Sequence, residues 1–554
     1  MMRAVAGGTP GSDARDRRGS EGIFADSGRT GSTEVAAATG SRAGDRSRAV
    51  GLRERRVYLL LYLLGLAALF VNAPAEVWDP AAREFVIIVG LVGLWRYGWG
   101  SVHLIRSLIY RRRVFPRWRR AAELLAGDSA AGAVEGTADR VFLIITSFRI
   151  RAETTAAVYR AAVEEAMRYG GPVTIVASIV ELADQRFIKA IFAKLRPPER
   201  VRLVFVRLGP QGKRDALAAA LRAVARMRPR PDDAVVVMDG DSLLSPGTLA
   251  RCLPFLRLMP DLAGLTTDED AVTDGGLLMR HWHRLRFAQR HVLMSSLGLS
   301  RRLLVMTGRM SLYRASIATD PDFIDIVRND ALDHWRLGRI TFLTGEDKST
   351  WFWLLERGLP MLYVPDVKIW TIEEPPAPGF LRGSTQLMLR WFGNMLRSSG
   401  RAIELGPRRI GLFTWWCLID QRLSMWTPLI GPTAALLFAF AVSPLFLYTY
   451  ALWVATTRLV LTLGLLTVRE RVSGLYPPLL YYTQVYGALV KTYVLFRLDR
   501  QRWTRQNIAR HAAGDRRWHE IGSTFVHTLA LATLVVVVAF LTGALELPPR
   551  LPIS

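Results

Sequence analysis

Two aspartates separated by one glycine are the residues of this chain whose types and spacing best suit chemistry. Asp239 and Asp241 directly follow the apolar run Ala234–Met238, which is typical of a buried strand. Carboxylate oxygens suit Mg²⁺ or Mn²⁺, and such ions keep only one or two protein carboxylates while the phosphates of a substrate fill the remaining positions. The spacing therefore indicates a metal bridge to a bound diphosphate. The alternative is that both residues simply end a strand in a solvated turn.

The elements that must position this pair follow an α/β pattern. Apolar runs alternate with helical patterns: the runs are Val141–Thr146, Val173–Ala177, Val201–Val206 and Ala234–Met238, and the helical patterns are 152–168, 213–228 and 247–258. This alternation predicts a Rossmann-like parallel sheet with crossover helices, which binds ligands at the carboxyl ends of its strands. Other acidic residues near that end are expected to be solvated loop positions: Asp268, Glu269, Asp270 and Asp330.

Composition and charge indicate a membrane protein. Of the 554 residues 50% are hydrophobic, and the mean hydropathy is positive, which argues against a large soluble enzyme. The formal net charge of +25 comes largely from Arg clusters that flank apolar segments, as positive-inside topology and anionic lipid headgroups produce. We therefore expect a lipid bilayer as partner and no nucleic acid. Cys252 and Cys417 are expected to be reduced thiols without a metal or disulfide role.

The first half of the chain divides into three regions. Residues 1–50 are rich in Gly, Ala, Ser, Arg and Asp, so they are expected to form a disordered tail without a cleavable signal. Residues 51–112 are expected to hold two transmembrane helices, Val57 to about Asn72 and about Phe85 to Tyr110, because Arg clusters flank both. Residues 113–400 contain no other 20-residue apolar run and are expected to be cytosolic.

Residues 401–554 are expected to combine interfacial and transmembrane helices. The segment Phe413–Trp426 is too polar to cross lipid but rich in Trp, so it should lie in the interface. Between Thr427 and Leu466 there is room for two spans with a tight turn near Ser443 and Pro444.

The next segment, Leu475–Leu498, is ambiguous. If it crossed the membrane, the many positive charges of residues 497–517 would face outward, so an interfacial or re-entrant segment broken by Pro477 and Pro478 is expected. A last span of about Ser523–Leu545 then leaves the C-terminus outside.

Several motifs together resemble a known family. The set is Asp239-Gly-Asp241, Gly345-Glu-Asp347, Gln386 with Arg390-Trp391, and apolar spans on both sides. It resembles the processive family 2 glycosyltransferases, the group of cellulose, chitin and hyaluronan synthases, over about residues 50–520. The stretches most similar to bacterial alginate (mannuronan) synthase catalytic subunits are Thr146-Ser-Phe-Arg-Ile150, Gly212-Lys-Arg-Asp-Ala-Leu217, Met238-Asp-Gly-Asp-Ser242, Arg286-Phe-Ala-Gln-Arg-His291 and Thr307-Gly-Arg-Met-Ser311.

The resemblance implies an α/β GT-A domain inserted between N- and C-terminal transmembrane regions. The implied activity is metal-dependent, inverting, processive transfer from a sugar nucleotide on the cytoplasmic side of the bacterial inner membrane. The growing polysaccharide would pass through a channel made by the chain's own spans. GDP-mannuronate is the favoured donor, and the alternatives are synthases that use UDP-glucose, UDP-N-acetylglucosamine or UDP-glucuronate. A transporter with a degenerate cytosolic domain is a more distant alternative, because its spans would normally form paired repeats.

The resemblance also assigns roles to residues. Asp347, with Glu346 beside it, is similar to the general base of the family. It would open a helix, whose positive end favours an ionised carboxylate. A plain N-cap is the structural alternative. The other implied roles are metal binding by Asp241 and Asp239, contact with the nucleotide sugar by Lys213, Asp239, Arg390, Gln386 and Arg505, and contact with the acceptor by Trp391, Thr307 and Gly308.

Three departures from the family pattern affect this assignment. Gln386 lies four residues before Arg390 instead of three, a spacing that still keeps both on one helix face. The early Asp-Asp nucleoside motif is replaced by Ser178-Ile-Val-Glu181 with Asp184 nearby, which fits guanosine better than uridine. Arg500-Gln-Arg-Trp-Thr-Arg505 resembles the Trp-Gly-Thr-Arg element of the family without its Gly, and it is equally typical of a positive-inside cluster.

A dense basic segment precedes and enters the region assigned to the acceptor. The ordinary interpretation of such a segment is a solvated basic face. The more specific interpretation is a surface along which an acidic polymer passes, and this interpretation favours a polyuronate over a neutral glucan as product. Its members are His281, His283, Arg284, Arg286, Arg290, His291, Arg301, Arg302 and Arg309. Because few residues follow the last span, a cyclic di-GMP-binding barrel is not expected there, and regulation is expected from a separate cyclic di-GMP-binding subunit.

Overall fold

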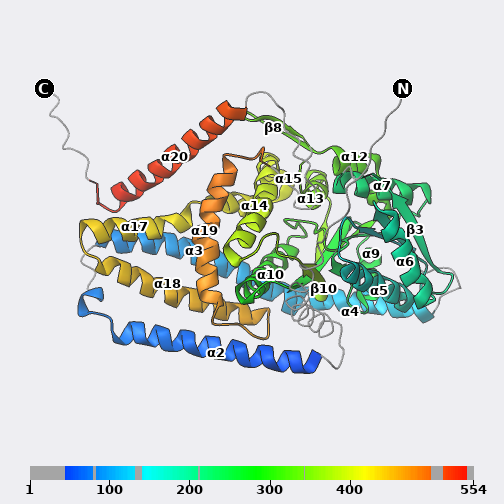
Figure 1. Cartoon of the computed structure of the whole chain (residues 1–554), viewed down its shortest axis with the longest axis horizontal. Helices are drawn as coiled ribbons and strands as arrows, with labels where there is room; N and C mark the ends of the chain where they lie inside the picture. Colours follow the sequence, from blue (N-terminus) through cyan, green and yellow to red (C-terminus); the bar gives the residue numbers. More distant parts are fainter. Residues whose placement is uncertain are drawn as a thin grey trace, which may run out of the picture.

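The protein joins an α/β domain to a set of long helices (Figure 1). The computed structural model describes residues 44–78, 83–131, 140–209, 212–341, 343–500 and 516–545. Four helices run lengthwise beside one another: α2 (Gly44–Val71), α3 (Arg83–Ile109), α17 (Thr427–Ala441) and α18 (Leu445–Gly464). The predicted tail lies outside the described residues as far as position 43, and residues 44–50 already belong to α2.

The first half of the sheet is parallel and consists of the predicted strands. They are β1 (Val141–Thr146), β2 (Val173–Ile179), β3 (Val201–Arg207) and β4 (Ala234–Asp239), in the order β3-β2-β1-β4. Val141 of β1 lies opposite Val173 on one side and Ala234 on the other. β1 is buried along its whole length, which explains its uninterrupted apolar sequence. The connecting helices are α5 (Ala152–Tyr169), α6 (Leu182–Leu195) and α7 (Lys213–Arg226).

The second half of the sheet is mixed, so the prediction of a wholly parallel sheet is wrong. β7 (Ser311–Arg314) runs antiparallel to both β4 and β6 (Gly264–Thr273). β10 (Met361–Glu373) is parallel to β6, and the short β5 (Ser242–Leu243) pairs antiparallel with β10 at the edge. The long helix α10 (Leu277–Gly298) connects β6 to β7 and returns the chain to the sheet in the opposite direction.

Three acidic residues that were expected in solvated loops are buried. Asp268 and Glu269 lie on β6 and are only 3% and 2% exposed. Arg469 donates to both carboxylate oxygens of Asp268, at 2.9 and 3.0 Å, and Arg401 donates to both of Asp330, at 2.6 Å. Buried carboxylates persist when they are paired, and these partners lie far along the chain. The prediction of solvated positions is therefore wrong for these three residues.

Shorter elements complete the domain. The helix predicted over 247–258 is divided into α8 (Thr248–Cys252) and α9 because Pro254 lacks the N–H that would continue the first helix. The thiols of Cys252 and Cys417 are buried and free. The remaining helices and strands are α4 (Phe115–Ala131), α9 (Pro254–Leu258), α11 (Ala315–Ala318), α12 (Pro321–Asn329), the hairpin β8 (Ala331–His334) and β9 (Gly338–Thr341), α13 (Glu346–Glu356), α14 (Phe380–Glu404), α15 (Gly406–Ile410) and α16 (Leu412–Leu423).

Three segments of the described chain are helical, long and apolar enough to cross a membrane. They are Leu412–Ala441, Leu445–Thr467 and Trp518–Leu541, which contain α16 with α17, α18, and most of α20 (Arg516–Leu541). The tight turn that was predicted near Ser443 and Pro444 separates α17 from α18. Because the first segment includes Phe413–Trp426, an interfacial place for those residues stays a prediction.

The N-terminal helices α2 and α3 and the later helix α19 (Tyr476–Leu495) are not among these three candidate spans. The apolar part of α2, Arg56–Val71, is shorter than the three candidate spans, so a crossing by α2 and α3 stays a prediction. α19 is one continuous helix with Pro477 in its first turn, so the prolines begin the helix and do not break it. It lies across α17 and α18 and does not run along them (Figure 1), and its interfacial or re-entrant place stays a prediction.

Candidate active site

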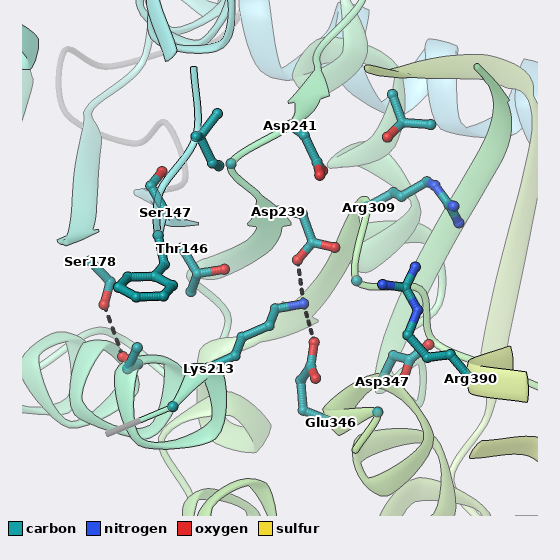
Figure 2. A pocket seen from close by; sticks show the side chains of 18 of the residues that line it. Thr146, Ser147, Ser178, Lys213, Asp239, Asp241, Arg309, Glu346, Asp347 and Arg390 are labelled. Atoms are coloured by element: carbon teal, nitrogen blue, oxygen red, sulfur yellow. Dashed lines mark hydrogen bonds and ion pairs between the residues drawn. The ribbon is translucent and has the colours of Figure 1, made fainter. Parts of the chain in front are cut away.

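The two aspartates lie where one strand ends and another begins. Asp239 ends β4, Asp241 precedes β5, and the N–H of Gly240 between them donates to the carbonyl of Thr146 at 2.9 Å. A β-carbon on Gly240 would lie 2.4 Å from Ser147 Oγ and 2.8 Å from the Thr146 carbonyl oxygen, so a larger residue does not fit. Figure 2 shows both carboxylates at the same opening. They line a cavity of about 420 Å³, which we call the first cavity.

Lys213 opens α7 and reaches between two carboxylates (Figure 2). Its Nζ lies 2.5 Å from Asp239 Oδ1 and also contacts Glu346 Oε1. Although burial opposes the charged form, Asp239 and Glu346 raise the pKa of Lys213. Burial likewise opposes ionisation of Glu346, but Lys213 lowers its pKa. Lys213 and Glu346 are therefore held charged, and the structure brings the predicted site residues Lys213, Asp239 and Glu346 together.

Asp347 lies in the first turn of α13 and is not its N-cap. The cap position is Gly345, which has a φ of +92° and whose β-carbon, if present, would lie 2.6 Å from Asn394 Nδ2. Burial and the neighbouring Glu346 raise the pKa of Asp347. The helix terminus was expected to favour the ionised carboxylate, whereas burial and Glu346 act against it. A raised pKa suits a general base better, because proton transfer is most efficient when the base's pKa lies near the working pH.

Two arginines add positive charge to this cavity. Arg390 was predicted from the sequence, whereas Arg309 was named only as a member of the basic segment. Both line the first cavity, and Figure 2 shows Arg390 extending toward Arg309. Arg309 lies 2.6 Å from Glu373 and 3.2 Å from Glu269, so its charge is partly balanced. The sequence alone did not indicate that Arg309 lines this cavity, because its partners Glu269 and Glu373 belong to the separate strands β6 and β10.

The predicted acceptor residues have different surroundings. Trp391 stacks on Trp282 with ring centroids 5.6 Å apart and an interplanar angle of 23°. Gly308 supports Asp239, because its carbonyl accepts the Asp239 N–H at 2.9 Å. Thr307 is buried, its hydroxyl contacts that of Thr266 at 3.1 Å, and it lines the second cavity described below, so its contact with the acceptor stays a prediction.

Two residues predicted to contact the nucleotide sugar are not placed at the site. Gln386 is exposed and lines neither cavity of this region, although Arg390 one turn later does line one. The spacing on α14 therefore does not give both residues the same surroundings, because Gln386 lies beyond the edge of the cavity. Arg505 lies outside the described residues.

A second cavity, of about 610 Å³, adjoins the first on the side of the long helices. Its lining comes from α3, α10, α14, α17, α18 and α19 together with the start of α13. Four residues line both cavities: Arg309, Asp347, Trp391 and Asn394. The candidate base and the candidate stacking ring therefore stand at the boundary between the two.

The basic segment does not form a solvated face. Its three histidines, His281, His283 and His291, are at most 4% exposed, because α10 packs between β6 and α3. Three of its arginines line the second cavity: Arg286, Arg290 and Arg309. The ordinary interpretation is therefore wrong for these six residues.

Comparisons with known proteins decide the family. Residues 138–394 match the family described as "Glycosyltransferase like family 2". The chain is 46% identical over 484 residues to "Glycosyltransferase alg8" of Pseudomonas syringae pv. tomato, covering 87% of this chain and 96% of the relative. It is 43% identical over 485 residues to "Glycosyltransferase alg8" of Azotobacter vinelandii, covering 87% and 97%. The chain belongs to the alg8 family of glycosyltransferases.

The family membership confirms the predicted enzyme class and fold. The α/β domain is a GT-A-like family 2 domain flanked by helices long and apolar enough to span a membrane. Among solved structures, the chain is similar to the mannosyltransferase PcManGT from Pyrobaculum calidifontis in complex with GDP-Man and Mn²⁺. The TM-score is 0.38 at 16% identity, over 71% of this chain and 97% of that one.

The donor set of this glycosyltransferase fits a hard divalent cation. Asp239 and Asp241 offer carboxylate oxygens at one opening, and the described residues contain no cluster of three or more His, Cys, Asp or Glu that could hold a metal. Two carboxylates are what Mg²⁺ or Mn²⁺ needs when phosphates of a substrate complete the coordination.

The end of the first cavity formed by β1 and β2 lacks acidic residues. Ser178 lines it, whereas Glu181 and Asp184, which follow in sequence, do not. Ser178 donates to the Ala216 carbonyl at 3.1 Å. The buried hydroxyl of Thr146 has no hydrogen-bond partner among the described residues. Hydroxyl and backbone groups therefore line this end of the cavity.

Proposed function

We propose that this glycosyltransferase polymerises GDP-mannuronate into polymannuronate, the alginate precursor. The observation that carries the proposal is that Asp347 and Trp391 line both cavities. A donor in the first cavity and the end of a growing polysaccharide in the second then meet beside a carboxylate and an indole ring. A chain that stays in the second cavity after each transfer is already placed for the next one, which makes synthesis processive.

On the donor side the protein binds the diphosphate with carboxylates and basic groups. Asp239 and Asp241 hold Mg²⁺ or Mn²⁺, which when bound neutralises charge on the departing nucleoside diphosphate. Lys213 and Arg390 reach the same opening, and a guanidinium gives two parallel hydrogen bonds to a phosphate. Arg309 shapes the opening from the far side.

On the acceptor side Asp347 acts as general base. It takes the proton of the acceptor hydroxyl while the new bond forms at the anomeric carbon and the bond to the diphosphate breaks. Because donor and acceptor approach from different cavities, attack comes from the face opposite the leaving group and the configuration inverts. Trp391 stacks on the acceptor sugar, with Trp282 behind it.

The charge of the second cavity supports the choice of sugar, and the polar groups of the first cavity support the choice of nucleotide. Basic side chains of α10 line the second cavity, which favours an acidic polymer over a neutral glucan. The donor end of the first cavity has hydroxyl groups at the position where an Asp-Asp motif would bind uridine, and this difference favours guanosine as the base. The resemblance of five sequence stretches to mannuronan synthase subunits supports the same choice.

The proposal places the α/β domain in the cytoplasm and the long helices in the bacterial inner membrane. Residues 51–112 supply two spans and residues 401–554 the interfacial and remaining transmembrane helices. The second cavity opens among α3, α17 and α18, so the polymer leaves the site between the helices and is translocated. A separate cyclic di-GMP-binding subunit regulates the enzyme.

Incorporation of labelled sugar tests the proposal. Membranes that contain the full chain are incubated with labelled GDP-mannuronate or with UDP-glucose, UDP-N-acetylglucosamine or UDP-glucuronate. We expect polymer only from GDP-mannuronate, and a mannuronate-specific lyase should degrade it. Membranes with Asp347→Asn are the background control. Incorporation from only a UDP-sugar would show that this sugar nucleotide is the donor in place of GDP-mannuronate. Incorporation from none of the four would contradict the proposal.

A further inference from the structure

The second cavity has an excess of positive charge. Its basic lining residues are Arg96, Arg286, Arg290, Arg309, Lys348, Arg458 and Lys491, and Asp347 is the only carboxylate among the described lining residues. Part of this charge is balanced from outside the cavity. Arg96 lies 2.5 Å from Asp420, and both Arg290 and Arg309 contact Glu269. Four of the seven form no ion pair within the described part of the chain: Lys348, which has the neighbouring charge of Asp347, and Arg286, Arg458 and Lys491.

Arg286 is the cation of the second cavity that contacts the candidate stacking ring. Its guanidinium carbon lies 4.2 Å from the centroid of Trp391 and 5.0 Å from that of Trp282, so it contacts both rings of the stacked pair. Burial, followed by repulsion from Arg309 and Arg290, lowers the pKa of Arg286. A guanidinium nevertheless stays protonated in proteins, so its surroundings favour an incoming anion.

Lys491 and Arg458 also line the second cavity, and both come from other helices than Arg286. Lys491 of α19 has its Nζ 4.9 Å from the ring centroid of Phe392, the residue next to Trp391, and 3.4 Å from Ser424 Oγ. Arg458 of α18 donates to the Tyr97 hydroxyl and lies 5.8 Å from the ring centroid of Tyr481. Each cation is therefore adjacent to an aromatic ring.

Aromatic faces and unpaired cations together match one class of ligand. Sugar rings stack on aromatic faces, and carboxylates pair with guanidinium and ammonium groups. A neutral polysaccharide would use only the rings and leave three cations desolvated without a counter-charge, an arrangement that is strongly unfavourable. A polymer with a carboxylate on each sugar uses both.

We propose that Arg286 is the specificity-determining residue of the acceptor site and binds the carboxylate of a uronate in the growing chain, and that Lys491 and Arg458 receive carboxylates further along. This inference rests on the proposed function, because it needs a polymer in the second cavity. It goes beyond that function in assigning acidic-polymer selectivity to three side chains. Arg286 is a positioning residue for the acceptor sugar that Trp391 stacks on.

Binding of oligosaccharides to the full-length protein tests the inference. The probes are a labelled oligomannuronate and the same oligomer after reduction of its carboxyl groups, which makes it neutral. We expect wild type to bind the acidic probe at least about tenfold more tightly than the neutral one, the effect of one good charged contact. Arg286→Gln should lose most of this ratio while keeping its affinity for the neutral probe, and Arg286→Lys should keep part of it.

The matched control is Arg280→Gln, which removes the same charge from the same helix but lines neither cavity. It should keep the wild-type ratio, which separates a specific contact from general attraction to a basic protein. Binding of GDP to each variant checks that it is folded, and Lys491→Gln, with a smaller expected loss of the ratio, serves if Arg286→Gln is unfolded.

Two results would overturn the inference: equal affinity of wild type for the two probes, or an unchanged ratio in Arg286→Gln. These outcomes differ from failure of the proposed function. If the protein prefers the acidic probe through Arg286 but uses no GDP-mannuronate, the donor assignment fails and acidic-polymer selectivity stands. If it makes polymannuronate without a contribution from Arg286, the function stands and the inference fails.

Discussion

Asp347 and Trp391 come from different helices, α13 and α14, yet both line the first and the second cavity. Asn394, one turn after Trp391 on α14, lies against Gly345 at the cap of α13 and accepts the Thr344 hydroxyl at 2.7 Å. This contact ties the start of one helix to the other. The geometry of transfer therefore depends on how α13 and α14 pack.

The glycine between the two aspartates should not tolerate a side chain. In Gly240→Ala the added β-carbon would clash with the Thr146 carbonyl, a backbone atom that cannot move without shifting β1. We expect a loss of about 1–3 kcal/mol of stability, as for other overpacked sites, and a large loss of synthesis because both carboxylates move. Thermal unfolding and sugar incorporation measure these effects.

Gly127→Ala, inside α4, is the control for that substitution. A β-carbon at Gly127 meets nothing within 4 Å and Ala is a good helix former, so stability should not fall and synthesis should stay near wild type. Equal behaviour of the two variants would show that the packing around Gly240 does not constrain the site.

Removal of one candidate metal ligand should affect binding as well as turnover. In Asp241→Ala we expect loss of metal-dependent nucleotide binding and a fall in synthesis of more than about 100-fold, because charge on the leaving diphosphate is no longer balanced. Asp333→Ala, whose carboxylate is 81% exposed on the β8–β9 hairpin, is the control. Calorimetric titration of GDP with and without Mn²⁺ measures the binding, and unchanged metal dependence in Asp241→Ala would remove this residue from the metal site.

The pH dependence of synthesis should report Asp347. A base works deprotonated, and burial together with Glu346 raises the pKa of Asp347, so the rate should fall on acidification at a higher pH than for an ordinary aspartate. Glu346→Gln removes the like charge and should move this acidic limb to lower pH, whatever it does to the maximal rate. Glu356→Gln, at the other end of α13, should leave the limb in place. An unshifted limb in Glu346→Gln would contradict the coupling.

The strands that carry the site were predictable because they are mainly apolar. β1 and β4 are buried almost throughout, so each appears in the sequence as a short apolar run, whereas the edge strand β3 is partly exposed and carries Arg202 but is still mainly apolar. β6 was missed because it contains Asp268 and Glu269, and Arg469, the partner of the Asp268 carboxylate, lies about two hundred residues away in the sequence. A pattern of neighbours along the chain contains no information about such a pair.

The candidate site likewise contains residues that the sequence could predict and residues whose place depends on the fold. Lys213, Asp239 and Asp347 were predictable because they occur in motifs with fixed spacing at element ends. The place of Arg286 was not predictable, since a basic residue in a helix is normally solvated and its contact with Trp391 depends on how α10 packs against α14. Gln386 lines neither cavity for a related reason: helical spacing predicts the face of a helix on which a residue lies but not where a cavity ends.

The most direct measurement compares Asp347→Asn with wild type in two assays on the same membranes. If Asp347 acts on the acceptor, synthesis from GDP-mannuronate should fall by about 10²–10⁴-fold, while affinity for GDP stays within a few-fold. Asp325→Asn, an exposed carboxylate on α12 that lines neither cavity, should match wild type in both assays. Near-normal synthesis by Asp347→Asn would contradict the assignment of the base and, with it, the account of transfer at the boundary of the two cavities.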